Sequence, residues 1–192
     1  MVGPLLLLAL PFLFVWYRGL KTRVCVFDQG LTYTKGGKTR TIRWNEIEKI
    51  WQYGLRYHIY FIPIATIHVY TIQTRDGTRL KLGSGVGKVK QLGEYIQAQV
   101  MNIMLPRAIE TYNSGGTLEF GRLNLSQAGI SNGKEVIAWN QIKNVKVWRG
   151  RLRIEKVGKL QWLGWANTIA VARVSNFWLF TTLVDNIRRS RG

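Results

Sequence analysis

The chain has 192 residues, which allows one or two domains and excludes a large multidomain protein. Its formal net charge of +18 predicts an anionic partner, which could be phospholipid headgroups, nucleic acid or an acidic protein. The single cysteine, Cys25, excludes an intrachain disulfide and a cysteine-based zinc site. Cys25 lies between Val24 and Val26 in a strand-like run, so we expect a buried thiol.

The chain starts with an apolar segment, residues 1–17, which carries no charged side chain. This length is at the lower limit for a helix that spans a bilayer, and Trp16 and Tyr17 end the run as interfacial aromatic residues do. Three basic residues follow and would orient the helix: Arg18, Lys21 and Arg23. We therefore expect a single membrane span within residues 1–19, with the rest of the chain on the cytoplasmic side. The alternatives are a secretory signal and a buried or monotopic helix.

After this segment, the chain contains an internal repeat, in which residues 24–51 correspond to residues 123–148. The matching positions are Gly30-Leu31 with Gly129-Ile130, Gly37-Lys38 with Gly133-Lys134, and Trp44-Asn45-Glu46-Ile47 with Trp139-Asn140-Gln141-Ile142. A repeat of this length predicts two copies of one small domain. We place the domains at residues 20–112 and 117–192.

Each copy is predicted to combine short antiparallel strands with one closing helix. The first copy has predicted strands at 23–27, 31–34, 39–43, 47–53, 68–74 and 78–82. Apolar residues spaced by three or four from Val89 to Met104 then predict a helix, which Pro106 should stop or bend. The second copy repeats this order and ends in a helix over 175–189. The predicted fold class is therefore α+β.

The order of strands, glycine turn, WNEI or WNQI turn, further strands and helix resembles the pleckstrin-homology-like (PH-like) fold. It is most similar to bacterial PH-like and GRAM-like domains of membrane proteins, in particular to a family with two such units. The resemblance implies two tandem PH-like domains that bind lipids, peptides or partner domains. Phosphoinositide-binding PH domains carry spaced basic residues in the first hairpin. The residues that fall in the matching hairpin here are Lys35, Lys38, Arg40 and Arg43.

A second basic set lies in the other copy. The stretch 143–159 holds seven Lys and Arg residues against one acid, Glu155. Arg149, Arg151 and Arg153 alternate with other residues and should line one face of a strand pair. With Lys156, they are our second candidate contact to an anionic surface. The alternative is a solvated sheet face.

No pattern points to catalysis. The stretch 83–90, GSGVGKVK, lacks the spacing of a phosphate-binding P-loop. Two interpretations of this stretch remain: an anion-binding helix start, or a flexible turn between a strand and a helix. His58 and His68 have no third ligand at a suitable spacing. We therefore expect no enzyme activity, no cofactor and no metal.

These observations favour a non-enzymatic, membrane-anchored binding or scaffold module on the cytoplasmic face, with a lipid, peptide or protein partner. Anionic phospholipid is the partner that the basic residues favour most. The alternatives are a small basic subunit of a membrane protein complex and a basic nucleic-acid-associated protein, which the apolar start disfavours.

Overall fold

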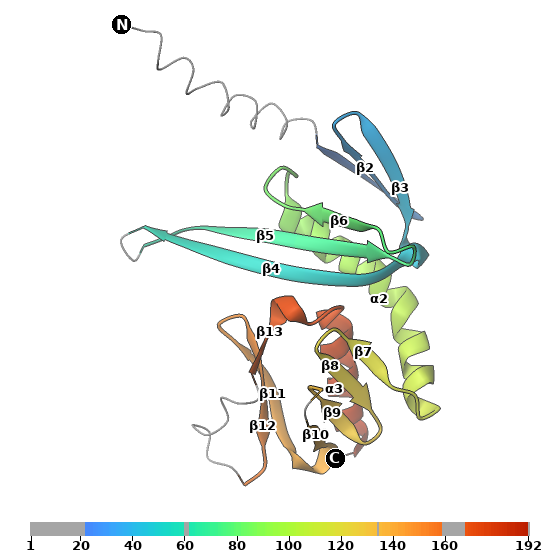
Figure 1. Ribbon diagram of the computed structural model, residues 1–192, viewed down its shortest axis with the longest axis vertical. Helices are drawn as coiled ribbons and strands as arrows, with labels where there is room; N and C mark the ends of the chain where they lie inside the picture. The colour runs from blue at the N-terminus through green and yellow to red at the C-terminus, as the bar shows by residue number, and fades with distance from the viewer. Residues whose placement is uncertain (1–21, 60–61, 134, 159–167, 192) are drawn as a thin grey trace, which may run out of the picture.

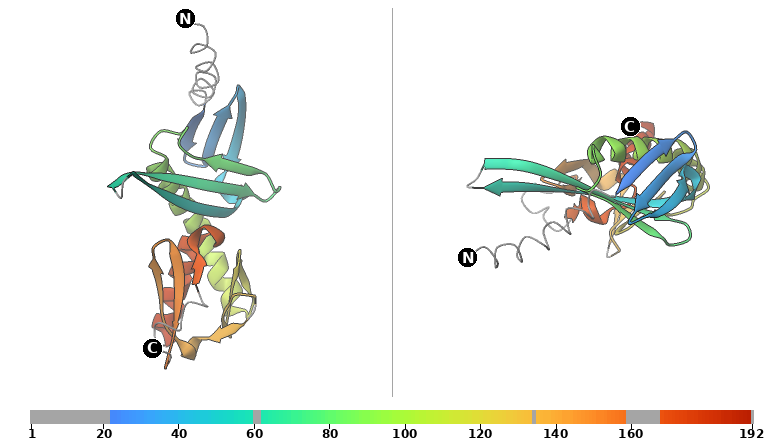
Figure 2. Two further views of the ribbon diagram at one scale, coloured as in Figure 1. Left: turned by 60° about the vertical axis from the view of Figure 1, so that its left-hand side comes forward. Right: turned by 90° about the horizontal axis from the view of Figure 1, so that it is seen from above.

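The computed structural model describes residues 22–59, 62–133, 135–158 and 168–191 (Figure 1). Two units lie one above the other, and the chain passes from the upper to the lower one through a long helix (Figures 1 and 2). The predicted membrane segment 1–19, with Arg18, and the orienting residue Lys21 lie outside the described residues. Arg23 opens the first described strand and is exposed.

The first unit has two three-stranded antiparallel sheets and a helix. Its elements are β1 (Arg23–Phe27), β2 (Gly30–Lys35), β3 (Lys38–Arg43), the 3-10 helix η1 (Trp44–Glu46), β4 (Ile47–Ile59), β5 (Ile62–Thr74), β6 (Arg79–Leu82) and α2 (Val89–Asn113). The sheet orders are β1-β2-β3 and β4-β5-β6. Within each sheet, the strands therefore pair with their neighbours in sequence, as the predicted hairpins require.

The second unit repeats this order with one extra strand at its start. Its elements are β7 (Leu118–Phe120), β8 (Leu123–Ser126), β9 (Gly129–Ser131), β10 (Val136–Ala138), η2 (Trp139–Gln141), β11 (Ile142–Trp148), β12 (Arg151–Lys156), β13 (Thr168–Ala170), η4 (Val171–Arg173) and α3 (Phe177–Arg191). The sheet orders are β10-β9-β8-β7 and β11-β12-β13. The extra strand, β7, extends the first sheet of this unit.

The repeated sequence motif builds the same corner in both units. Trp44 and Trp139 are buried in the short helices that follow β3 and β10. Each indole N–H donates to a backbone carbonyl, that of Asp28 at 2.8 Å in the first unit and that of Ser126 at 3.0 Å in the second. The repeated Trp therefore fills the core and fixes the turn that precedes β2 in the first unit and β9 in the second.

Each unit has its own hydrophobic core, and α2 contributes to both. Ile96 and Val100, from its first half, pack in the first core. Ala108 and Tyr112, from its second half, pack in the second core. This packing explains why the helix does not stop at Pro106, where we expected it to stop or bend, but continues to Asn113. The predicted domain bounds stay a prediction.

Two further expectations are wrong. Cys25 is exposed, because β1 is an edge strand and Cys25 lies on the opposite face from Val24 and Val26. The fold class is also corrected, since the described chain is mostly β, with four small antiparallel sheets and two helices.

The prediction of a membrane-spanning helix is corrected as well. Within the part of the chain that the structure describes, no helix is long and apolar enough to cross a membrane. The longest described helix, α2, carries charged residues along its length, among them Lys90, Glu94, Arg107 and Glu110. This finding overturns the predicted fold class with its membrane helix, and with it the predicted single-pass location with cytoplasmic domains.

Candidate functional site: a basic sheet face and an inter-unit groove

The first predicted basic set lies on the hairpin of β2 and β3. Lys35 and Lys38 face each other across the hairpin end and are exposed. The Arg40 guanidinium donates to the carboxylate of Asp76 at 2.6 Å, so an acid of the β5–β6 turn pairs with its charge. Arg43 is exposed, and its backbone N–H donates to Glu46. This set therefore offers two lysines at the hairpin end and one arginine already in an ion pair.

The second predicted basic set lies on the hairpin of β11 and β12. Lys146 is directly opposite Arg153, and Trp148 is directly opposite Arg151. Directly opposite residues share a face of a sheet, so these four side chains lie on one face. Leu152 and Ile154 point to the other face and are buried in the core of the second unit. We call the outer side, with Lys146, Trp148, Arg151 and Arg153, the basic sheet face.

Trp148 is the centre of the basic sheet face. Trp148 is 53% exposed, although Trp is highly buried on average. The guanidinium carbon of Arg149 lies 4.4 Å from the ring centroid, and that of Arg153 lies 6.0 Å from it. Arg149 occupies the tight turn with a positive φ of 49°. The turn and the strand thus hold two cations beside one exposed aromatic ring.

The other charges near this hairpin are partly paired. Lys146 forms an ion pair with Glu155 at 3.4 Å, and Arg151 donates to the hydroxyl of Thr168 at 3.1 Å. Lys156 lies on the opposite face of β12 from Arg151, where it pairs with Glu135 at 3.0 Å. The structure therefore groups three of the predicted residues around Trp148 and sets Lys156 apart.

The two basic sets lie in different units and are well separated in space (Figures 1 and 2). They do not combine into one site. The residue that the sequence reasoning missed is Trp148, although its place beside Arg149 and opposite Arg151 in a hairpin is a signal that could have found it.

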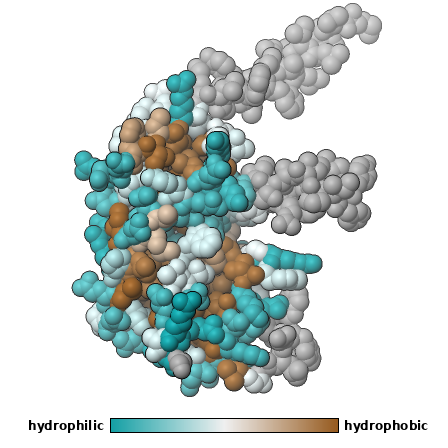
Figure 3. Space-filling model, turned by 180° about the vertical axis from the view of Figure 1, so that it is seen from behind, coloured by the Kyte–Doolittle hydropathy of each residue, from teal (hydrophilic) through white to brown (hydrophobic). Residues whose placement is uncertain are grey.

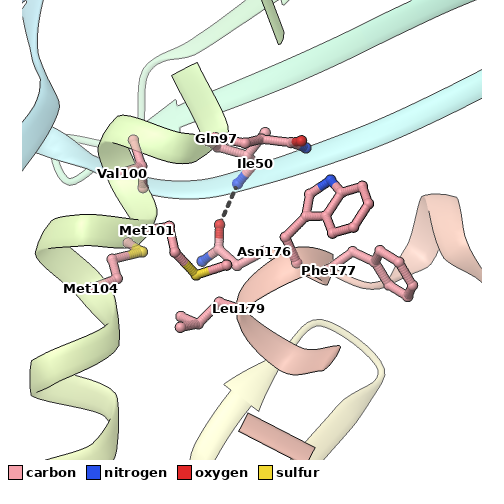
Figure 4. A pocket seen from close by; sticks show the side chains of 9 residues that line it. Ile50, Gln97, Val100, Met101, Met104, Asn176, Phe177 and Leu179 are labelled. Carbon is pink, nitrogen blue, oxygen red and sulfur yellow. Dashed lines mark hydrogen bonds between the residues drawn. The ribbon is translucent and has the colours of Figure 1, made fainter. Parts of the chain in front are cut away.

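A groove separates the two units, and Asn176 joins them across it (Figure 4). The Asn176 backbone N–H donates to the Ile50 carbonyl at 2.8 Å, and its side-chain N–H donates to the Glu48 carbonyl at 2.8 Å. Its side-chain oxygen accepts from the Ile50 N–H at 2.9 Å. Asn176 has a φ of 49°, a conformation that Asn adopts more readily than most residues. Asn176 therefore fixes α3 against β4.

The groove beside Asn176 has an apolar floor with a polar side. A small cavity of about 20 Å³ lies between Met101, Met104 and Leu179, and Trp178, which also lines it, is 49% exposed. A wider part of about 310 Å³ continues toward Tyr53, His68 and Tyr70. The side-chain oxygen of Gln97 is buried there and accepts no hydrogen bond, while its N–H₂ group donates to Gln52 at 2.9 Å.

One buried phenol lies at this groove. Tyr70 packs against Gly93 of α2, where a Cβ would collide with its ring. Burial raises the pKa of Tyr70, and the nearby carboxylate of Glu94 raises it further. Tyr70 therefore stays neutral and serves as a packing residue rather than as an acid or base.

No catalytic group is apparent in the described part of the chain. Among its residues, no group of three or more His, Cys, Asp and Glu side chains could hold a metal ion. The stretch 83–90 leads into α2, where Lys88 precedes the helix with a φ of 51° and no side chain caps the helix start. The absence of enzyme activity, cofactor and metal remains a prediction.

Comparison with known proteins gives one result. A family model described as Family of unknown function (DUF6585) matches residues 1–192, the full length of the sequence. No curated protein and no solved structure matches. The surface chemistry of the chain therefore has to carry any functional argument.

Proposed function

The chain belongs to the family of unknown function DUF6585, and we propose that it is a non-enzymatic binding module that engages an anionic phospholipid surface through the basic sheet face. One observation carries the proposal: Trp148 is 53% exposed and has the guanidinium groups of Arg149 and Arg153 beside its ring, at 4.4 and 6.0 Å from the centroid. The proposal involves described residues only and requires no spanning segment.

Both kinds of side chain on this face suit a lipid headgroup layer. An indole ring combines an apolar body with a polar N–H and is favoured at the boundary between headgroups and acyl chains. Guanidinium groups bind phosphate oxygens with two parallel hydrogen bonds. Each basic residue close to an anionic leaflet contributes about 1 kcal/mol, and the screening length of about 8 Å at physiological salt limits this to charges near the surface.

A nucleic acid is the strongest competitor, because Trp and Arg also stack on bases. Proteins that bind single strands without sequence preference stack successive bases on several aromatic side chains. Among the described residues of β11, β12 and β13, only one aromatic ring, that of Trp148, lies on the basic sheet face. This favours the phospholipid surface, and nucleic acid becomes an outcome of the test.

The resemblance to PH-like domains supports a binding role but not the first hairpin as its main site. In the first hairpin Arg40 pairs with Asp76, whereas among the described residues no acid pairs with Arg149 of the second hairpin. A role as a small basic subunit of a complex would use the same face for an acidic protein.

The test uses the full chain, vesicles of neutral phosphatidylcholine, and vesicles in which part of the lipid is anionic phosphatidylserine. We expect binding that requires the anionic lipid, weakens as salt rises, and falls further in Trp148→Ala. Equal binding to both kinds of vesicle would overturn the proposal. So would a short single-stranded oligonucleotide that binds tightly and displaces the chain from vesicles, since it would assign the face to nucleic acid.

A further inference from the structure

The first unit has a free sheet edge at β1. Among the described residues, β1 pairs with β2 alone, and the sheet order is β1-β2-β3. Val24 and Val26 lie on the inner side of the strand, opposite Tyr33 and Leu31 of β2. Val26 is nevertheless 37% exposed. An edge strand with uncovered apolar residues is a template for pairing with another strand, and most proteins protect such edges.

A groove runs under this edge. It has a volume of about 720 Å³ and separates the inner face of β1 from the start of α2. Its apolar walls come from Val24, Val26, Leu92 and Tyr95, and Lys88 lines it at the helix start. Figure 3, which shows the molecule from behind, has brown apolar areas among the teal side chains in the upper part of this face. The groove therefore offers an unfilled apolar surface beside unpaired backbone groups.

The second unit shows what occupies the equivalent place. The pair Leu125 and Ile130 in β8 and β9 corresponds to the pair Val26 and Leu31, because each lies next to the pair that contains the repeated glycine, Gly129 or Gly30. There, the extra strand β7 pairs antiparallel with β8 and covers its edge. Unit one has no described strand at this position.

The last residue of β7 fills the gap between sheet and helix. Phe120 pairs with Leu123, is 2% exposed, and packs edge-on against Phe180 of α3 with ring centroids 5.3 Å apart. Its carbonyl accepts from the Ser175 N–H at 3.3 Å, just before α3. In the second unit, an added strand therefore covers the sheet edge, and one large apolar side chain at its end fills the space between sheet and helix.

We propose that the free edge of β1 and the groove beneath it bind an extended segment of an acidic partner protein, which adds to β1 as an antiparallel strand. One large apolar side chain of that segment, opposite Val24, takes the place that Phe120 has in the second unit. Backbone hydrogen bonds to the edge give affinity, and the pocket for that side chain gives specificity.

The charges around the opening select the partner. Arg23 is exposed at the start of β1, and Lys88 lines the groove at the start of α2. The first turn of α2 carries no acidic residue. The chain as a whole has a formal charge of +18, which disfavours pairing of two copies at this edge. Acidic residues beside the apolar anchor are therefore the matching chemistry.

The experiment measures binding of a synthetic peptide to the full chain by fluorescence anisotropy. The probe carries the Leu-Glu-Phe sequence of β7, flanked on each side by two Asp residues. We expect saturable binding that Val26→Glu weakens by at least about tenfold, because this change puts a carboxylate into the apolar groove and repels the peptide. Replacing Phe of the peptide by Ala should have the same effect without any change in the protein.

The matched control is Val136→Glu. Val136 is 57% exposed on β10, which is also an edge strand, but at the other end of its sheet. Val136→Glu should leave peptide affinity unchanged. The proposal is overturned if the peptide does not bind, if Val26→Glu and Val136→Glu behave alike, or if a peptide with Lys flanks binds equally well. A dimer in sedimentation that Val26→Glu dissociates would also overturn it, since a second copy would then occupy the edge.

Discussion

The two units build the same corner from the same residues. They differ at the edge of their first sheet and in the length of the strands of their second sheet. In the second unit β7 covers the edge of β8, whereas in the first unit the edge of β1 is free among the described residues. The strands β4 and β5 have 13 residues each, against 7 and 6 in β11 and β12. The repeated residues thus specify the core and the turn, and the residues that differ specify the surfaces available to partners.

The comparison predicts that truncation of either corner tryptophan lowers the free energy of unfolding by the same amount. Trp44 is 4% exposed and Trp139 is 8% exposed, and each also donates a hydrogen bond to the backbone. Trp44→Ala and Trp139→Ala should each lower the free energy of unfolding by about 3–5 kcal/mol in chemical denaturation. Trp178→Ala, at a half-exposed position, is the control and should cost less than about 1 kcal/mol. A loss below 1 kcal/mol at either corner would break the structural equivalence.

The corner glycines provide the next largest effect. A Cβ at Gly30 would collide with the Ile42 carbonyl, and a Cβ at Gly129 would collide with the Ile137 carbonyl. Because the obstacle is backbone in both cases, Gly30→Ala and Gly129→Ala should each destabilise by about 1–3 kcal/mol. Gly87→Ala is the control, since a Cβ there meets no atom within 4 Å. Thermal unfolding of the three variants measures the difference, and a Gly30→Ala variant as stable as Gly87→Ala would contradict the shared corner.

Asn176 tests whether the two units act as one body. Asn176→Ala removes two side-chain hydrogen bonds to β4 and places Ala at a positive φ, so it should cost about 1–3 kcal/mol. Asn176→Gly removes the same hydrogen bonds, but Gly adopts a positive φ without strain, so this variant should lose less stability. Hydrogen exchange of the Ile50 amide should accelerate in both variants, because its acceptor is the Asn176 side chain. Unchanged exchange would show that this contact does not hold the units together.

The smallest effect concerns a contact that links the two sheets of the first unit. The Thr74 hydroxyl, the Thr78 N–H and Arg40 donate to Asp76 and hold the pKa of its carboxyl well below its usual range. Because the pKa of Asp76 is lower in the folded state, its ionised carboxylate stabilises the fold at pH values above the unfolded-state pKa of 3.8. This stabilisation is lost as the pH falls through the folded-state pKa. Asp76→Asn should therefore lower the Tm at neutral pH and flatten its decline below about pH 4. Parallel Tm profiles for the two proteins would contradict this role.

The local features of this fold were predictable, and the tertiary ones were not. Hairpins, the repeated corner and the α2 helix follow from turn residues and apolar spacing, which act over a few positions. The exposure of Cys25, the continuation of α2 past Pro106 and the Asn176 contact depend on which elements meet in space. In the candidate site, alternation predicted the shared face of Arg151 and Arg153. The same alternation places Lys156 on the other face, but it could not show the ion pair of Lys156 with Glu135, because that pair depends on which strands meet in space.

The measurement that tests the proposed function most directly compares matched charge reversals in the two hairpins. Arg149→Glu with Arg153→Glu changes the basic sheet face and the turn beside it, and Lys35→Glu with Lys38→Glu changes the first hairpin by the same total charge. Affinity of the full chain for anionic vesicles should fall by at least about tenfold in the first double variant and change little in the second. Equal losses would show that net charge alone attracts the chain to the surface, and no loss in the first variant would show that the basic sheet face does not bind it.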